Sequence, residues 1–110
     1  MHSRGPVRHQ EEVVLNVYDL SQKWNGWLGP AGIGLYHSGV QIYGTEYTFG
    51  NGGVMTHTPR QTGDPECVFR VGIVIGKLSG MTRRDVEQAV FNLKADFPPG
   101  CYRYVVVALW

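Results

Sequence analysis

The chain has 110 residues and a formal net charge of +1, and 43% of its residues are hydrophobic against 17% charged. Such a balanced charge offers no surface for a polyanion, so we expect no nucleic acid partner. No apolar run approaches the roughly 18 residues of a membrane span, so we expect a single globular domain with no membrane partner.

The polar amino-terminal segment, residues 1–11, is expected to be a disordered tail, and residues 12–110 are expected to form the domain. The tail lacks the apolar core of a secretory signal. The two cysteines, Cys67 and Cys101, make neither a disulfide framework nor a zinc pattern. We therefore expect reduced thiols and a cytoplasmic or nuclear location, with no metal and no cofactor.

Residues 13–19 predict a strand, because their nearly continuous apolar run suits a strand that is covered on both faces. Residues 21–29 predict either one helical turn or a loop over the sheet. Trp24 and Trp27 would share one side of such a turn. They are expected to cap the core, with the rim of a binding groove as the alternative.

Residues 34–43 predict a strand with a histidine near its middle. Alternation places His37 and Gly39 on one face, so the glycine is expected to leave an unfilled space beside the imidazole. A histidine on a rigid strand beside a gap is a candidate general base. The alternative is a structural histidine bonded to a neighbouring carbonyl, and this strand alone favours that alternative.

Gly44 and Thr45 predict a two-residue hairpin turn that begins with glycine, and residues 46–49 predict the returning antiparallel strand. Residues 50–53 are rich in glycine and predict a flexible loop, either a plain surface turn or a lip beside a cleft. His57 lies in a threonine-rich segment before a proline and is interpreted as a loop residue with little functional weight.

Residues 67–76 predict a further strand with a kink at Gly72. Cys67 stands at the start of this strand. The acidic residues Asp64 and Glu66 are close in sequence and disfavour a thiolate, so Cys67 is a weak candidate for a nucleophile.

Residues 82–97 predict a helix that Thr82 caps, with Asp85 completing a capping box. Apolar residues recur along it at spacings of three and four, and Pro-Pro-Gly at residues 98–100 ends it. Residues 101–110 predict a last strand. The expected fold is a small α/β (α+β) domain, an antiparallel sheet with packed helices.

Three segments together resemble the PPPDE family, the permuted papain-fold, desumoylating-isopeptidase-like cysteine peptidases, above all their deubiquitinating branch. These segments are residues 13–19, 32–44 and 46–50, and the resemblance continues through the helix to about Tyr102. The resemblance implies a compact, permuted papain-like domain whose catalytic pair is a histidine and a later cysteine. It implies hydrolysis of the isopeptide bond that joins ubiquitin or SUMO to a lysine.

By this resemblance, His37 matches the catalytic histidine of the family. The nucleophile has no match, because Leu109 falls where the cysteine is expected and the likeness fails from Val105 onwards. We therefore expect a domain that is incomplete at its carboxyl end, lacks the catalytic helix, and is inactive. Cys101 could replace the nucleophile only if its segment refolds, and an incidental buried thiol is the alternative.

Two other readings remain open at this point. The chain could be a non-catalytic module that binds ubiquitin-like modifiers or another protein, or it could be an unstable fragment. The sequence also leaves open whether the chain forms a homodimer.

Overall fold

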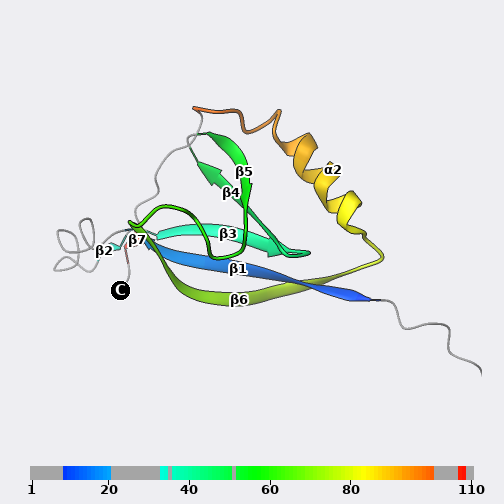
Figure 1. Ribbon diagram of the computed structural model, residues 1–110, viewed down its shortest axis with the longest axis horizontal. Helices are drawn as coiled ribbons and strands as arrows, with labels where there is room; N and C mark the ends of the chain where they lie inside the picture. Colours follow the sequence, from blue (N-terminus) through cyan, green and yellow to red (C-terminus); the bar gives the residue numbers. More distant parts are fainter. Residues whose placement is uncertain (1–8, 21–32, 35, 51, 101–106, 109–110) are drawn as a thin grey trace, which may run out of the picture.

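The computed structural model describes residues 9–20, 33–34, 36–50, 52–100 and 107–108. Five antiparallel strands form one sheet in the order β5-β4-β3-β1-β6, a helix lies beside it, and β2 pairs with β7 (Figure 1). This arrangement confirms the predicted α/β fold class with its small antiparallel sheet. The strands of the sheet are β1 Gln10–Leu20, β3 Tyr36–Ile42, β4 Thr45–Gly50, β5 Gly53–His57 and β6 Cys67–Ser79. The remaining elements are β2 Ile33–Gly34, α2 Arg83–Leu93 and β7 Val107–Ala108.

Some predictions fall on residues outside the described part. These are the disordered tail up to residue 8, the turn or loop that carries Trp24 and Trp27, and most of the last predicted strand. Of that last strand, the structure describes the short β7, which pairs with β2.

Strand β1 lies between β3 and β6 and extends the predicted strand at both ends. Its register with β3 sets Tyr18 opposite His37 and Asn16 opposite Gly39. Because side chains alternate along a strand, these four residues share one face of the sheet. We call it the polar face, and we call the opposite face, which carries Val40, Ile42 and Tyr47, the helix face.

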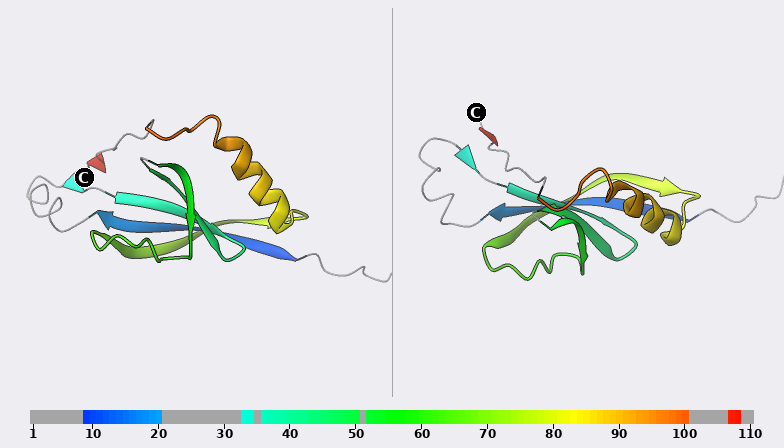
Figure 2. Two further views of the ribbon diagram at one scale, coloured as in Figure 1. Left: turned by 45° about the horizontal axis from the view of Figure 1, so that its top comes forward. Right: turned by 90° about the horizontal axis from the view of Figure 1, so that it is seen from above.

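The two faces are covered by different parts of the chain. Helix α2 lies against the helix face, where an apolar groove of about 590 Å³ remains between Ile42, Tyr47 and Val86. The loop of residues 58–66 covers the polar face, and its Arg60 guanidinium stacks 4.3 Å from the centre of the Phe69 ring. In the left view of Figure 2, α2 lies above the sheet and the loop runs along β6 at the lower edge of the sheet.

The hairpin between β3 and β4 turns one residue earlier than predicted. Ile42 pairs with Thr45, so the turn residues are Tyr43 and Gly44, with φ of 51° and 71°. Positive φ at both positions is the signature of a type I′ turn, which is disfavoured for tyrosine. Contacts far away in sequence hold Tyr43 there: its backbone N–H donates to Glu11 Oε1, and its hydroxyl donates to the Met81 carbonyl.

The predicted loop position of His57 was wrong, because this residue is the last of β5 and pairs with Glu46. The glycine-rich stretch before β5 is a tight hairpin, since Gly50 pairs directly with Gly53. The segment 54–56 contains residues that favour a strand, and Pro59 ends the strand only after His57.

The predicted kink at Gly72 was also wrong. Gly72 pairs regularly with Asn16, and the register shifts fall elsewhere in β6, where Arg70 and Ile75 are the extra residues. A Cβ at Gly72 would lie 3.1 Å from both Asn16 Oδ1 and the Arg60 guanidinium. The glycine therefore permits a close approach of side chains and does not mark a bend.

Helix α2 starts as predicted and ends sooner. The Thr82 hydroxyl accepts from the Asp85 backbone N–H, and the Asp85 carboxylate accepts from the Thr82 N–H, which completes the capping box. The helix ends at Leu93, four residues before Phe97, because the backbone N–H of Asp96 bonds back to the Leu93 carbonyl and tightens the chain into a turn. No helix in the described part of the chain is long and apolar enough to span a membrane.

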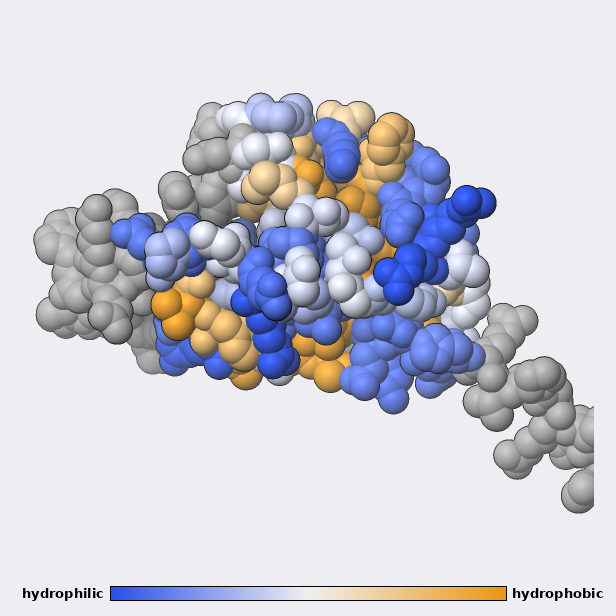
Figure 3. Space-filling view, viewed as in Figure 1, coloured by the Kyte–Doolittle hydropathy of each residue, from blue (hydrophilic) through white to orange (hydrophobic). Residues whose placement is uncertain are grey.

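Apolar side chains reach the surface both along β6 and beside α2 (Figure 3). Val86 is the one buried residue of α2, whereas Leu93 and Phe97 keep 47% and 44% of their surface exposed. The largest fully buried side chains of the described part are polar or carry a hydroxyl: Tyr18, Glu46 and Asn16. The best-buried part of the domain is therefore a polar cluster on the polar face.

We expect Gly39→Ala to destabilise the domain by about 2–3 kcal/mol, because an added Cβ would overlap Glu46 Oε2 and lie 2.8 Å from Glu46 Cδ. Urea denaturation measures the change. Gly76→Ala is the matched control, since no atom lies within 4 Å of its added Cβ, and its free energy of unfolding should change by less than about 0.5 kcal/mol. Equal stability of the two variants would contradict this account of the packing.

Candidate active site

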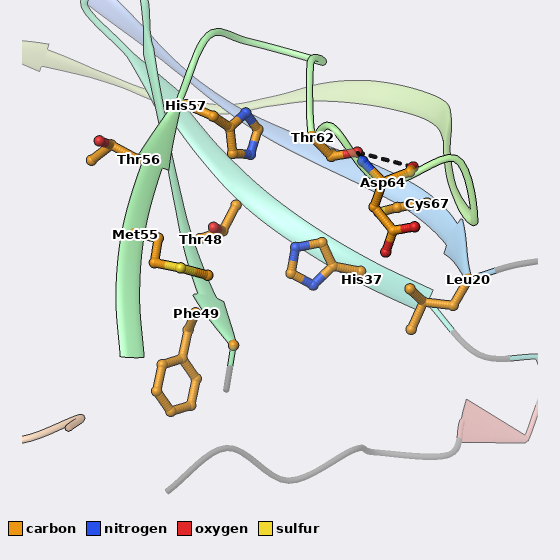
Figure 4. A pocket seen from close by; sticks show the side chains of 11 residues that line it. Leu20, His37, Thr48, Phe49, Met55, Thr56, His57, Thr62, Asp64 and Cys67 are labelled. Atoms are coloured by element: carbon orange, nitrogen blue, oxygen red, sulfur yellow. Dashed lines mark hydrogen bonds between the residues drawn. The ribbon is translucent and has the colours of Figure 1, made fainter. Parts of the chain in front are cut away.

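A cleft of about 360 Å³ opens on the polar face, between the strands and the loop of residues 58–66. His37 from β3 and His57 from β5 both project into it, and Asp64 and Cys67 lie on its other side (Figure 4). The other lining residues are Leu20, Thr48, Phe49, Gly50, Met55, Thr56 and Thr62. The cleft therefore gathers nitrogen, oxygen and sulfur groups from residues far apart in the sequence.

His37 lines this cleft from the middle of the sheet. Its ring packs against the Tyr18 ring at a centroid distance of 5.9 Å, tilted by 37°. Burial lowers the pKa of His37, while the carboxylates of Glu46 and Asp64 oppose that shift. A neutral imidazole is the form that accepts a proton, so the site suits a general base.

The space beside His37 that the sequence suggested is not empty. A Cβ at Gly39 would overlap the carboxylate of Glu46, which fills that space from the neighbouring strand β4. The predicted gap was therefore wrong, and the glycine is needed for the approach of a buried side chain. The sequence analysis did not identify Glu46 as a site residue. The pattern that could have indicated it is a single carboxylate within the β-forming segment 45–49.

The Glu46 carboxylate is fully buried and accepts hydrogen bonds from three donors. Tyr18 Oη donates to Oε2 at 2.5 Å, and Asn16 Nδ2 donates to Oε1 at 2.6 Å. The backbone N–H of Arg60 also donates to Oε1, at 3.0 Å. A buried carboxylate requires such partners, because an unpaired one would cost several kcal/mol in desolvation.

His57 joins the same cluster. Its Nδ1 donates to the Thr58 carbonyl at 2.7 Å, since a carbonyl oxygen can only accept. Its Nε2 is left facing Glu46 Oε2 at 3.5 Å, the distance of a partly buried ion pair when the imidazole is protonated. Only the cross-strand pairing with Glu46 reveals this role, and single-sequence reasoning had no direct signal for it.

Cys67 is the one cysteine within the described residues, and it lines the same cleft as His37. Burial raises the pKa of its thiol, a hydrogen bond with Thr62 opposes this, and the carboxylates of Asp64 and Glu46 raise the pKa further. The thiol therefore stays protonated at neutral pH, in agreement with the expectation of a weak nucleophile. Cys101 and Leu109 lie outside the described residues.

Among the described residues, no three His, Cys, Asp or Glu side chains converge to hold a metal ion. What the cleft offers is a proton acceptor, a second imidazole and a buried carboxylate. These groups suit acid–base chemistry on a polar substrate.

We expect the His37 imidazole to titrate with a midpoint below 6.5, the ordinary value for histidine, because burial disfavours its charged form. The unfolded chain then binds this proton more readily, so His37 also reduces folding stability as the pH falls below 6.5. The chemical shift of the ring carbon Cε1 against pH measures the midpoint, with the denatured chain as the control. A midpoint at or above 6.5 would be inconsistent with a desolvated imidazole.

Comparison with known proteins identifies the family. The model of the PPPDE peptidase domain matches residues 11–106. The desumoylating isopeptidase 1 homolog of Caenorhabditis elegans is 29% identical over 113 residues, which cover 96% of this chain and 33% of that protein. A DeSI-like protein of Arabidopsis thaliana is 33% identical over 98 residues, which cover 84% of this chain and 42% of that protein. The chain thus spans between a third and a half of the length of these curated relatives. Because the family match covers most of the chain, the chain belongs to the PPPDE peptidase family, as the resemblance predicted.

Proposed function

We propose that this chain carries the histidine part of a cysteine-type isopeptidase site that acts on conjugates of SUMO or ubiquitin. The observation that carries the proposal is His37, a desolvated imidazole on a rigid strand beside an open cleft, in a chain of the PPPDE family. A relative from Caenorhabditis elegans is named a desumoylating isopeptidase 1 homolog, which supports SUMO conjugates as the first substrates to test.

In the proposed reaction, His37 takes the proton of a cysteine thiol, and the thiolate attacks the carbonyl carbon of the isopeptide bond. The imidazolium then gives its proton to the leaving lysine amine as the carbon–nitrogen bond breaks. A water molecule, deprotonated by the imidazole, hydrolyses the thioester, which releases the carboxylate of the modifier and restores the thiol. His37 serves as base and then as acid in each half of the reaction, because the departing thiolate takes its proton back from the imidazolium.

We further propose that this chain alone does not supply the thiol. Leu109 falls at the position where the resemblance expects the cysteine, and Cys101 stays a candidate substitute. The raised pKa of Cys67 argues against a thiolate at that position. Removing a nucleophile from a catalytic group costs orders of magnitude in rate, because its members act as a unit.

We expect the purified 110-residue chain to show no thiol-dependent cleavage of fluorogenic SUMO or ubiquitin substrates, and rates equal to those of His37→Ala. The matched control is His9→Ala, which changes a histidine whose side chain is 71% exposed and outside the cleft. Turnover that His37→Ala abolishes and His9→Ala preserves would overturn the inactive-chain proposal. Cys67→Ser and Cys101→Ser would then identify the sulfur.

Sequencing of the transcript tests whether the gene also encodes the missing nucleophile. Sequencing beyond the codon for Val105 would reveal whether an alternative reading continues in frame with an asparagine-cysteine-asparagine segment and a helix. A product with that segment should cleave SUMO or ubiquitin conjugates, and its His37→Ala variant should lose the activity by about 10⁴-fold or more. A product that keeps both groups and cleaves neither modifier would contradict the isopeptidase proposal.

The second candidate function is a module that binds a ubiquitin-like modifier without cutting it. Two observations favour it. The cleft is fully formed, and Cys67, the cysteine that lines it, has a raised thiol pKa and is therefore poorly suited to attack an isopeptide carbonyl. We expect titration of the ¹⁵N-labelled chain with SUMO or ubiquitin to shift amide resonances at His37, His57 and Thr62. Residues of α2 such as Glu87, which lie on the other face, serve as the internal control. Unchanged resonances at millimolar modifier would count against binding.

A further inference from the structure

We propose that Glu46 is the positioning residue of this site. Its buried carboxylate fixes Tyr18, against whose ring His37 packs, and it also fixes the loop that forms the opposite wall of the cleft. This inference rests on the proposed function for the role of His37 as a general base. The contacts that Glu46 makes do not depend on whether the chain is catalytically active.

The carboxylate is held from several directions. Oε2 accepts from the Tyr18 hydroxyl, and Oε1 accepts from the Asn16 amide and from the Arg60 backbone N–H. These donors come from β1 and from the loop of residues 58–66, while Glu46 itself belongs to β4. A group that is fully buried and bonded to two other segments has one orientation, so it can serve as a fixed reference for its neighbours.

Tyr18 transmits this orientation to His37. The phenol hydroxyl is tied to Glu46, and the ring lies between the His37 ring and the Phe69 ring, each at 5.9 Å. Arg60 in turn covers Phe69. The Tyr18 ring cannot tilt without breaking its short hydrogen bond to a charged acceptor, so His37 packs against a fixed surface.

The same carboxylate holds the other wall of the cleft. It binds the loop through the Arg60 N–H and faces His57 Nε2 at 3.5 Å. Thr62 and Asp64 follow in this loop and line the cleft opposite His37. Glu46 thus sets the separation between the histidine and the groups across from it.

The charge of Glu46 has a chemical consequence as well. It opposes the effect of burial and raises the pKa of His37, as does Asp64, whereas His57 lowers it. A negative group behind the imidazole stabilises the imidazolium that forms when His37 accepts a proton. Positioning and electrostatic support therefore come from one side chain.

The experiment measures His37 directly by NMR, in the full chain and without substrate. Glu46→Gln keeps the shape and removes the charge, and Glu87→Gln, an exposed carboxylate on α2, is the matched control. We expect Glu46→Gln to shift the His37 titration midpoint downwards and to weaken the nuclear Overhauser effect between the His37 and Tyr18 rings. Glu87→Gln should change neither. A folded Glu46→Gln variant with both observables at their wild-type values would overturn the proposal.

If Glu46→Gln does not fold, Tyr18→Phe tests the positioning role instead, because it removes only the hydroxyl that binds Glu46 and keeps the ring. We expect a weaker ring-to-ring Overhauser effect with His37, and Glu46→Asp should retain part of the upward charge effect on the His37 midpoint. Wild-type ring contacts in Tyr18→Phe would overturn the positioning role. None of these readouts needs cleavage, so a failure of the isopeptidase proposal in the turnover assays remains distinct from a failure here.

Discussion

One buried charge determines how the polar face is built. Glu46 has no contact with solvent, so its carboxylate depends on donors that other segments bring to it: Asn16 and Tyr18 from β1 and the Arg60 N–H from the loop. These donors meet it only in the observed register, and Gly39 must lack a side chain for β3 to pass. A slip of one residue in β4 would turn the carboxylate towards α2 and its apolar groove. The cluster therefore specifies strand pairing at the same place where it surrounds the candidate general base.

The two faces of the sheet divide the tasks of the domain. The polar face holds the cleft, both imidazoles and the thiol of Cys67, and a loop with few regular elements covers it. The helix face is apolar and carries the groove beside Ile42 and Val86. The cleft on the polar face can thus be desolvated by a hydrogen-bonded network, while the buried aliphatic side chains of Ile42 and Val86 lie on the other side of the sheet.

Much of this arrangement follows from sequence because it is local. A nearly continuous apolar run predicted β1, alternation predicted β3, and the hairpin turn predicted β4 as the returning strand. The capping box predicted the start of α2 at Thr82. The early end of α2 at Leu93 follows from a local turn at Asp96, and the other misses are long-range. The turn at Tyr43 was displaced because contacts with Glu11 and Met81 hold a conformation that tyrosine alone disfavours. Glu46 and His57 were missed because their roles arise from pairing across strands, which no single segment displays. The role proposed for His37 came from the resemblance to a family, since its strand alone favoured a structural histidine.

Helix α2 packs only weakly against the sheet, and this affects how the domain behaves in solution. One buried residue, Val86, and the bonds around Thr82 and Tyr43 secure this helix, whereas the sheet is joined by continuous backbone ladders and the Glu46 cluster. Such unequal coupling divides a protein into cooperative units that open at different free energies. Helix α2 should detach as its own unit below the threshold for global unfolding, so its amide protons should exchange with deuterium well before those of β1. The histidine site would remain assembled in that partly opened form.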